Sequence, residues 1–306
     1  MIDFRAASAG PTAPATSPLG GILASLAGEG GAILRASPGE LLAHLCAGPA
    51  PGRPLVVAAG ATPGLVEAAC ELAATGVTIV PPDRDGLPER ASLLLALDHA
   101  GPGARCLLPL ASPVGALAEP AFLHEAAGAA EGGLILDIAF AAFEPALELA
   151  IPWPGTAALL GPERPFLDGA REPWLALEIG RAQAPPSPVS PPEGAETVLA
   201  WDEWIRSALE ARDGIVTWPR GRESYAPGVI TFAIDGWPAR EAAAILEESF
   251  GLLVDAGRPT ATPLPGAPDE LLRVFPSARH REEDVEALVG ALWRVAETRR
   301  PDPVAH

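Results

Sequence analysis

The stretch Gly132-Gly-Leu-Ile-Leu-Asp137-Ile-Ala-Phe140 decides the fold class of this chain. A continuous apolar run of this kind is typical of a strand that is covered on both faces, as in a parallel sheet. The run ends at Asp137, which places a carboxylate at the carboxyl end of the strand, where open α/β sheets bind their ligands. A buried carboxylate needs a cation, a metal ion or a protonated ring nitrogen as its partner. The alternative is that Asp137 only caps the segment that follows.

Strands and helices alternate on the N-terminal side of this stretch. Apolar runs predict strands at Leu55–Ala59, Val77–Val80 and Arg105–Leu110, and the residues between them have helical periodicity. Thr62 is a suitable N-cap for the first of these connecting helices, and Pro63 fits its first position. We therefore predict an α/β fold whose mostly parallel sheet is flanked by helices and joined by right-handed crossovers. The predicted helices are Pro38–Cys46, Pro63–Ala74, Leu87–His99 and Pro120–Ala130.

A proline-rich segment divides the chain. Residues 184–193 hold five prolines in ten positions, which is typical of an extended linker. We predict a large α/β domain over residues 1–183, a linker over 184–196 and a small α+β domain over 197–306. Residues 1–31 and 151–180 show little periodicity. In the small domain the patterns predict helices at Trp201–Arg212, Pro238–Phe250 and Arg281–Thr298, and strands at Gly228–Ile234, Leu252–Val254 and Leu271–Phe275.

The composition argues against several classes of protein. The formal net charge is −18, and basic residues do not cluster before the last few positions, so we expect no nucleic-acid partner. No apolar run is long enough to span a bilayer, and no basic segment precedes an apolar one at the N-terminus, so we expect a cytoplasmic protein without membrane contact. Cys46, Cys70 and Cys106 are too widely spaced for a disulfide framework or a metal site and predict reduced, mostly buried thiols.

Four short motifs follow one another along the chain. They are Gly60-Ala-Thr62 before a helix, Ser112-Pro-Val-Gly115, Asp137-Ile-Ala-Phe140, and Leu272-Arg-Val274 before the last helix. In their order and spacing they resemble motifs of the fold-type-I pyridoxal-phosphate enzymes, nearest to histidinol-phosphate aminotransferase and threonine-phosphate decarboxylase. The resemblance extends over most of the chain.

The resemblance implies a role for each motif. Gly60, Ala61 and Thr62 would hold the cofactor phosphate at the N-terminus of a helix, whose free N–H groups bind anions. Asp137 would pair with the pyridine nitrogen and keep it protonated. Arg273 would hold the substrate carboxylate in two hydrogen bonds. The alternatives are an ordinary strand-to-helix turn at the first motif and a surface charge on an edge strand at Arg273.

The chain departs from this family at its decisive residue. The family uses a lysine that forms a Schiff base with the cofactor, and no lysine occurs anywhere in the 306 residues. Arg164 lies near the place of that lysine, but a guanidinium stays protonated and forms no aldimine. Arg171 resembles the family's phosphate-binding arginine. Ser112 and Phe140 replace an asparagine and a tyrosine, which weakens or removes two hydrogen bonds to the oxygen on the cofactor ring.

Three hypotheses remain open. The first is a degenerate aminotransferase-like protein, a non-catalytic partner subunit that keeps a remnant phosphate or carboxylate site and binds pyridoxal phosphate, if at all, without a covalent bond. The second is an active enzyme of the same superfamily that acts on an amino acid or amino-phosphate, with His124 or His99 as the base. The third is a small-molecule-binding α/β protein of unrelated function. The resemblance implies a homodimer, or a heterodimer with an active paralogue.

Overall fold

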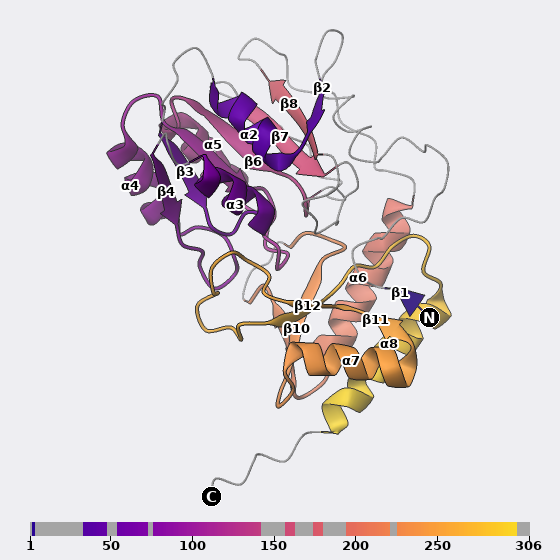
Figure 1. Cartoon of the computed structure of the whole chain (residues 1–306). Coiled ribbons are helices and arrows are strands. Elements are labelled where there is room, and N and C mark those ends of the chain that lie inside the picture. The colour runs from indigo at the N-terminus through magenta and orange to yellow at the C-terminus, as the bar shows by residue number, and fades with distance from the viewer. Residues whose placement is uncertain are drawn as a thin grey trace, which may run out of the picture.

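The structure is a computed structural model that describes residues 2–3, 33–47, 54–72, 76–141, 157–162, 174–179, 194–220 and 225–298. These residues form two parts, each with its own main sheet and its own apolar core (Figure 1). The first part contains the elements from β2 to β8, and the second contains those from α6 to α8.

The first part is built on a seven-stranded sheet. Five consecutive strands of this sheet, from β7 to the edge strand β4, are parallel to one another. The other two are antiparallel to their neighbours, β8 to β7 and β2 to β8. This confirms the predicted mostly parallel α/β fold. In spatial order the strands are β2 (Ile33–Ala36), β8 (Trp174–Ile179), β7 (Ala157–Pro162), β6 (Gly133–Asp137), β5 (Arg105–Pro109), β3 (Leu55–Ala58) and β4 (Val77–Val80).

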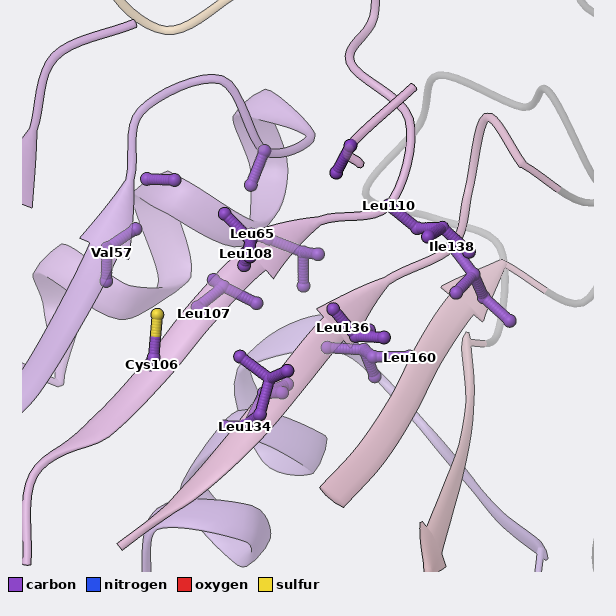
Figure 2. Close-up of a cluster of buried hydrophobic side chains, with 14 of the residues drawn as sticks. Val57, Leu65, Cys106, Leu107, Leu108, Leu110, Leu134, Leu136, Ile138 and Leu160 are labelled. Atoms are coloured by element: carbon purple, nitrogen blue, oxygen red, sulfur yellow. The ribbon is translucent and has the colours of Figure 1, made fainter. Parts of the chain in front are cut away.

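Helices cover both faces of this sheet. The chain passes from β3 to the edge strand β4 and then returns across β3 to β5, and right-handed connections place helices on opposite faces when the direction reverses. Accordingly α2 (Pro38–Ala47) packs against α3 (Pro63–Glu71), while α4 (Arg90–Ala100) packs against α5 (Pro120–Ala129). Every residue of β5 and β6 is buried, and Figure 2 shows Leu136 of β6 beside Leu160 of β7.

The second part joins three helices to one face of a four-stranded antiparallel sheet. Ile230, Phe232 and Ile234 alternate on the core face of β10, as expected of a sheet with one covered face. The sheet order is β12 (Asp255–Gly257), β13 (Leu271–Val274), β10 (Ile230–Ile234) and β9 (Ile215–Trp218), and the helices are α6 (Ala195–Glu210), α7 (Ala239–Phe250) and α8 (Glu282–Glu297).

The N-terminal strand lies with the second part of the chain. β1 (Ile2–Asp3) pairs in parallel with β11 (Leu252–Leu253), and Figure 1 shows it among the C-terminal elements. Ile2 packs against the core of this part.

Several predicted boundaries are corrected. α6 begins at Ala195, inside the predicted linker, because Gly194 takes a left-handed conformation that starts the helix there. Regular strands β7 and β8 occupy parts of the segment 151–180 that showed little periodicity. The division at residues 184–193 lies outside the described residues. Of the three thiols only Cys106 is buried, since Cys46 is half-buried and Cys70 is exposed.

None of the helices in the described part of the chain is both long enough and apolar enough to cross a membrane.

Candidate functional site

Three of the predicted site residues meet at one edge of the large sheet. Thr62 follows β3, Ser112 follows β5 and Asp137 ends β6, and these three strands are neighbours in the order β6-β5-β3. Because β3, β5 and β6 are parallel, their carboxyl ends lie at the same edge. The chain also reverses its direction of winding between β3 and β5, which is where open α/β sheets bind their ligands.

The Asp137 carboxylate is bonded to Thr62. Its Oδ2 accepts two hydrogen bonds of 2.7 Å, one from the backbone N–H of Thr62 and one from the Thr62 hydroxyl. Its Oδ1 accepts a third, of 3.0 Å, from the backbone N–H of Ala139. Asp137 is only 1% exposed. The carboxylate therefore lies at the N-terminus of α3 and finds its donors within the chain.

Burial and hydrogen bonding act on this carboxyl in opposite directions. Burial raises the pKa of Asp137 because the charged form loses its hydration. The hydrogen bonds from Thr62 and Ala139 favour the charged form and oppose that shift. The net pKa is raised, so burial is the stronger of the two effects.

A second loop covers the turn Gly60-Ala-Thr62. A Cβ atom on Gly60 would lie 1.6 Å from the carbonyl oxygen of Gly86, so the two backbones are in direct contact. Gly86 has φ +81° and lies against the Ser112 side chain on its other side. The loop is braced from within, because Oδ1 of Asp83 accepts the N–H groups of Asp85 and Leu87. The segment 83–87 is thus wedged between the first two predicted motifs.

Ser112 has its hydroxyl engaged in this wedge. Its Oγ donates to the backbone oxygen of Asp85 at 2.8 Å and accepts the N–H of Ala116 at 3.1 Å. Ser112 is 0% exposed. In this arrangement its hydroxyl ties two loops together.

The same loops contact the second part of the chain. Oδ1 of Asp85 accepts the backbone N–H of Arg220 at 2.8 Å, and the N–H of Ala226 donates to the carbonyl of Gly115 at 2.7 Å. Ala116 also forms an isolated antiparallel bridge with Tyr225. The edge that carries Asp137 is therefore joined to the second part of the chain by hydrogen bonds from the backbone N–H groups of Arg220 and Ala226.

A buried ion pair on α6 supports this junction. Nε of Arg206 lies 2.8 Å from Oδ2 of Asp202, and both residues are almost fully buried. The Arg206 guanidinium also donates to the carbonyls of Trp218 and Val229, and it lies 4.2 Å from the centre of the Tyr225 ring. Oδ1 of Asp202 accepts the N–H of Gly228 at 2.8 Å. The pair fixes both ends of the chain segment that meets the large domain.

The remaining predicted site residues have different positions. Phe140 is 4% exposed and belongs to the large apolar core. Arg273 lies on β13 in the small sheet, where its strand neighbours are Thr231 and Asp255, and its guanidinium is 5.9 Å from the Phe275 ring centre. It is 5% exposed, so the alternative of a surface charge on an edge strand is wrong. Its role toward a substrate carboxylate stays a prediction. Arg164 and Arg171 lie outside the described residues.

His99 and His124, the two bases considered for an enzyme without the lysine, are exposed residues of α4 and α5. No group of three or more histidine, cysteine or acidic residues suited to a metal ion occurs within the described ranges.

Sequence reasoning missed Asp85, Asp202 and Arg206. The pair on α6 has a signal in the sequence, because an aspartate and an arginine four residues apart face the same side of a helix. That signal predicts an exposed pair as readily as a buried one. Asp85 has no such signal for its contacts with Ser112 and Arg220, since these residues lie 27 and 135 positions away.

A pocket of about 700 Å³ lies elsewhere, beside the start of α7 in the small domain. Its lining carries charges of both signs, and Arg240 is paired with Glu270 at 2.7 Å. The charged and aromatic residues of this lining are Asp235, Trp237, Arg240, Arg258, Asp269 and Glu270.

Solved structures share this fold, although no family model and no curated protein matches the sequence. A NifS-like protein from Rickettsia africae has a TM-score of 0.70 at 12% identity and covers 92% of this chain and 87% of its own. A cysteine desulfurase from Thermococcus onnurineus has a TM-score of 0.61 at 14% identity, with coverage of 87% and 79%. A decarboxylase from Sulfurospirillum multivorans has a TM-score of 0.60 at 13% identity, with coverage of 87% and 74%.

These likenesses establish the fold, which this chain shares with all three structures. At identities of 12–14% they carry no statement about activity. The narrower likeness to histidinol-phosphate aminotransferase is not among them and stays a prediction.

The described residues do not fit pyridoxal phosphate in this arrangement. The donors that the phosphate would need, the N–H and hydroxyl of Thr62, are bonded to Asp137. The carboxylate that the ring nitrogen would need is engaged by the same bonds.

Proposed function

We propose that this protein is a non-catalytic member of the fold-type-I scaffold, and that it acts as a partner subunit for a catalytic chain of the same fold. The observation that carries the proposal is the lack of lysine in all 306 residues, on a scaffold whose large sheet and C-terminal part are both retained. Without a side-chain amine the chain can form no lysine Schiff base and no lysine-mediated proton transfer.

The geometry at the sheet edge supports the same proposal. Asp137 is bonded to Thr62, and Ser112 is bonded to the loop at Asp85, so their polar atoms serve to hold the edge together. The two histidines that an alternative mechanism would use are on exposed helix positions. These contacts argue against turnover at this edge.

The test of lost catalysis uses the full-length chain with pyridoxal phosphate and a panel of amino acids and amino-phosphates. We expect no turnover above that of the free cofactor, and no visible absorbance band that borohydride fixes to the chain. The α-amine at the N-terminus is the one remaining amine, so a fixed adduct is mapped by peptide mass spectrometry and the assay is repeated with N-terminally acetylated protein. Chain-dependent turnover that survives acetylation would contradict the proposal.

The test of assembly is native mass spectrometry after co-expression with a lysine-containing fold-type-I paralogue from the same genome. We expect a heterodimer in excess of either homodimer. A chain that stays monomeric, alone and with that paralogue, would argue against a partner subunit. A stable homodimer without any heterodimer would contradict the role as a partner subunit, but it would be compatible with the proposed loss of catalysis.

A further inference from the structure

We propose that the anion site at the N-terminus of α3 is occupied by the chain's own Asp137 carboxylate, so that this turn binds neither free phosphate nor the phosphate of pyridoxal phosphate. The inference goes beyond the proposed function, which requires only that the Schiff-base chemistry is lost. A chain without lysine could still hold the cofactor without a covalent bond, and the inference excludes this.

The first step concerns the donors. The start of a helix offers unpaired N–H groups and a positive partial charge, which together favour an anion. Thr62 is the N-cap of α3, but its side chain makes no hydrogen bond to its own helix. Both its hydroxyl and its N–H donate instead to Oδ2 of Asp137, each at 2.7 Å. An internal carboxylate thus takes the two Thr62 donors that an external phosphate would use at this turn.

The second step concerns the length of the cofactor. In pyridoxal phosphate the ring nitrogen and the phosphate are separated by ring carbons and a methylene group. A carboxylate on the nitrogen and a turn on the phosphate must therefore stand apart by the breadth of the ring. The contacts of 2.7 Å between Asp137 and Thr62 leave no space for even one atom between them.

The third step concerns the space above the turn. The carbonyl of Gly86 lies so close to Gly60 that a single added methyl group would overlap it. Gly60, Ala61 and Thr62 are all buried. The covering loop is held on its far side by Ser112 and by the backbone N–H of Arg220. A ligand would have to displace this loop as well as the carboxylate.

The experiment is equilibrium dialysis and tryptophan fluorescence of the full-length chain with pyridoxal phosphate and, separately, with inorganic phosphate. We expect no saturable binding of either up to about 1 mM, the weak end of specific affinities. Saturable binding that phosphate competes for, and that Thr62→Val weakens, would overturn the inference. Binding without turnover would leave the proposed function standing, so the two can fail separately.

A variant tests whether Asp137 is the group that excludes the anion. In Asp137→Ala the donors of Thr62 become free, and we expect phosphate-competable binding of pyridoxal phosphate to strengthen about 10- to 100-fold, the contribution of a hydrogen bond to a charged group. The double variant Asp137→Ala/Thr62→Val is the matched control and should lose this gain. A folded Asp137→Ala protein without any gain would overturn the assignment to Asp137. Where that variant does not fold, the measurement on the unaltered chain decides.

Discussion

At Asp137 a single carboxylate competes with every external anion for the first donors of α3. Because the carboxylate belongs to the same chain, its effective concentration at the turn is high. The occupancy of a dissolved ligand depends on the concentration of that ligand in solution. Two donors from Thr62 and one from Ala139 satisfy the carboxylate within the chain. A carboxylate at this edge of the sheet can therefore close the turn from within the chain.

Gly60→Ala tests the close approach between the turn and its covering loop. The added methyl group would meet the carbonyl of Gly86 at 1.6 Å, so the loop must shift, and we expect the free energy of unfolding to fall by about 3 kcal/mol. Gly64→Ala is the matched control, because nothing lies within 4 Å of a Cβ there. That variant should gain about 0.4–1 kcal/mol from the reduced freedom of the unfolded chain. Urea unfolding measures the free energy of unfolding of both variants. Equal changes in the two variants would contradict the close contact between Gly60 and Gly86.

Asp137→Asn tests the raised pKa of this carboxyl. The ordinary pKa of an aspartate carboxyl is 3.8, and the pKa of Asp137 in the folded chain is higher. As the pH rises above 3.8, the unfolded chain therefore loses this proton before the folded chain does, and the folded state becomes less favoured. The asparagine variant lacks this effect. The free energy of unfolding of the unaltered protein, minus that of the variant, should decrease as the pH rises above about 4, and should level off once the buried carboxyl has ionised.

Urea unfolding from pH 4 to pH 8 measures this difference. Ser112→Ala serves as the control, because it removes a buried hydrogen bond without changing an ionisable group. A difference for Asp137→Asn that increases with pH would show that the hydrogen bonds outweigh burial.

Among the elements, α6 connects the two parts of the chain through a buried ion pair. Asp202 and Arg206 lie one turn apart on the helix and reach three backbone groups of the segment from Trp218 to Val229. Burial raises the pKa of Asp202, while the Arg206 charge beside it opposes that shift. Removal of either residue would leave the charge of the other buried without a counter-charge, so the pair acts as a unit.

Arg206→Met should lower the free energy of unfolding by about 3–5 kcal/mol, because it leaves the Asp202 carboxylate buried without its cation. The double variant Asp202→Leu/Arg206→Met should cost less than this single change. Arg90→Ala is the matched control, since it breaks an ion pair with Glu125 in which both side chains are well exposed, and should cost less than about 1 kcal/mol. Thermal unfolding compares the stability of the three variants. Equal losses of stability would show that the α6 pair contributes no more than an exposed ion pair.

On the scale of the whole molecule, the two parts meet where the loops at the Asp137 edge contact the segment that α6 positions. Each part has its own core, but Ala226, Val229 and Phe275 pack into the core of the large sheet. Asp85 joins the parts most directly, because its carboxylate accepts the N–H of Arg220 and its carbonyl accepts the Ser112 hydroxyl.

Asp85→Ala should loosen this junction without unfolding either core. The lost acceptor leaves the N–H of Arg220 without its partner, and we expect a cost of about 1–3 kcal/mol. Hydrogen exchange should accelerate at Arg220 and Ala226 and stay unchanged in β10 and β13. Asp85→Asn keeps an acceptor oxygen and should restore most of the protection. Uniform acceleration over both sheets would indicate global destabilisation in place of a local junction.

Local patterns in the sequence predicted most of the fold. The apolar runs at β3, β5 and β6, and the helical stripes of α2, α5, α7 and α8, match the structure within a few residues. The strands β1, β2, β7, β8, β9 and β12 were missed. A strand of two to six residues carries too little periodicity to stand out, and strand pairing depends on partners that are distant in the chain.

By itself the sequence determined the mostly parallel sheet, the position of Asp137 at its carboxyl edge and the loss of every side-chain amine. These properties follow from residue identity and from periods of two to four residues, which are local. Only the tertiary structure decided that Asp137 bonds to Thr62, 75 positions away, and that Gly86 closes over the turn. Such contacts depend on strand order and loop packing, since they join side chains that no short pattern connects.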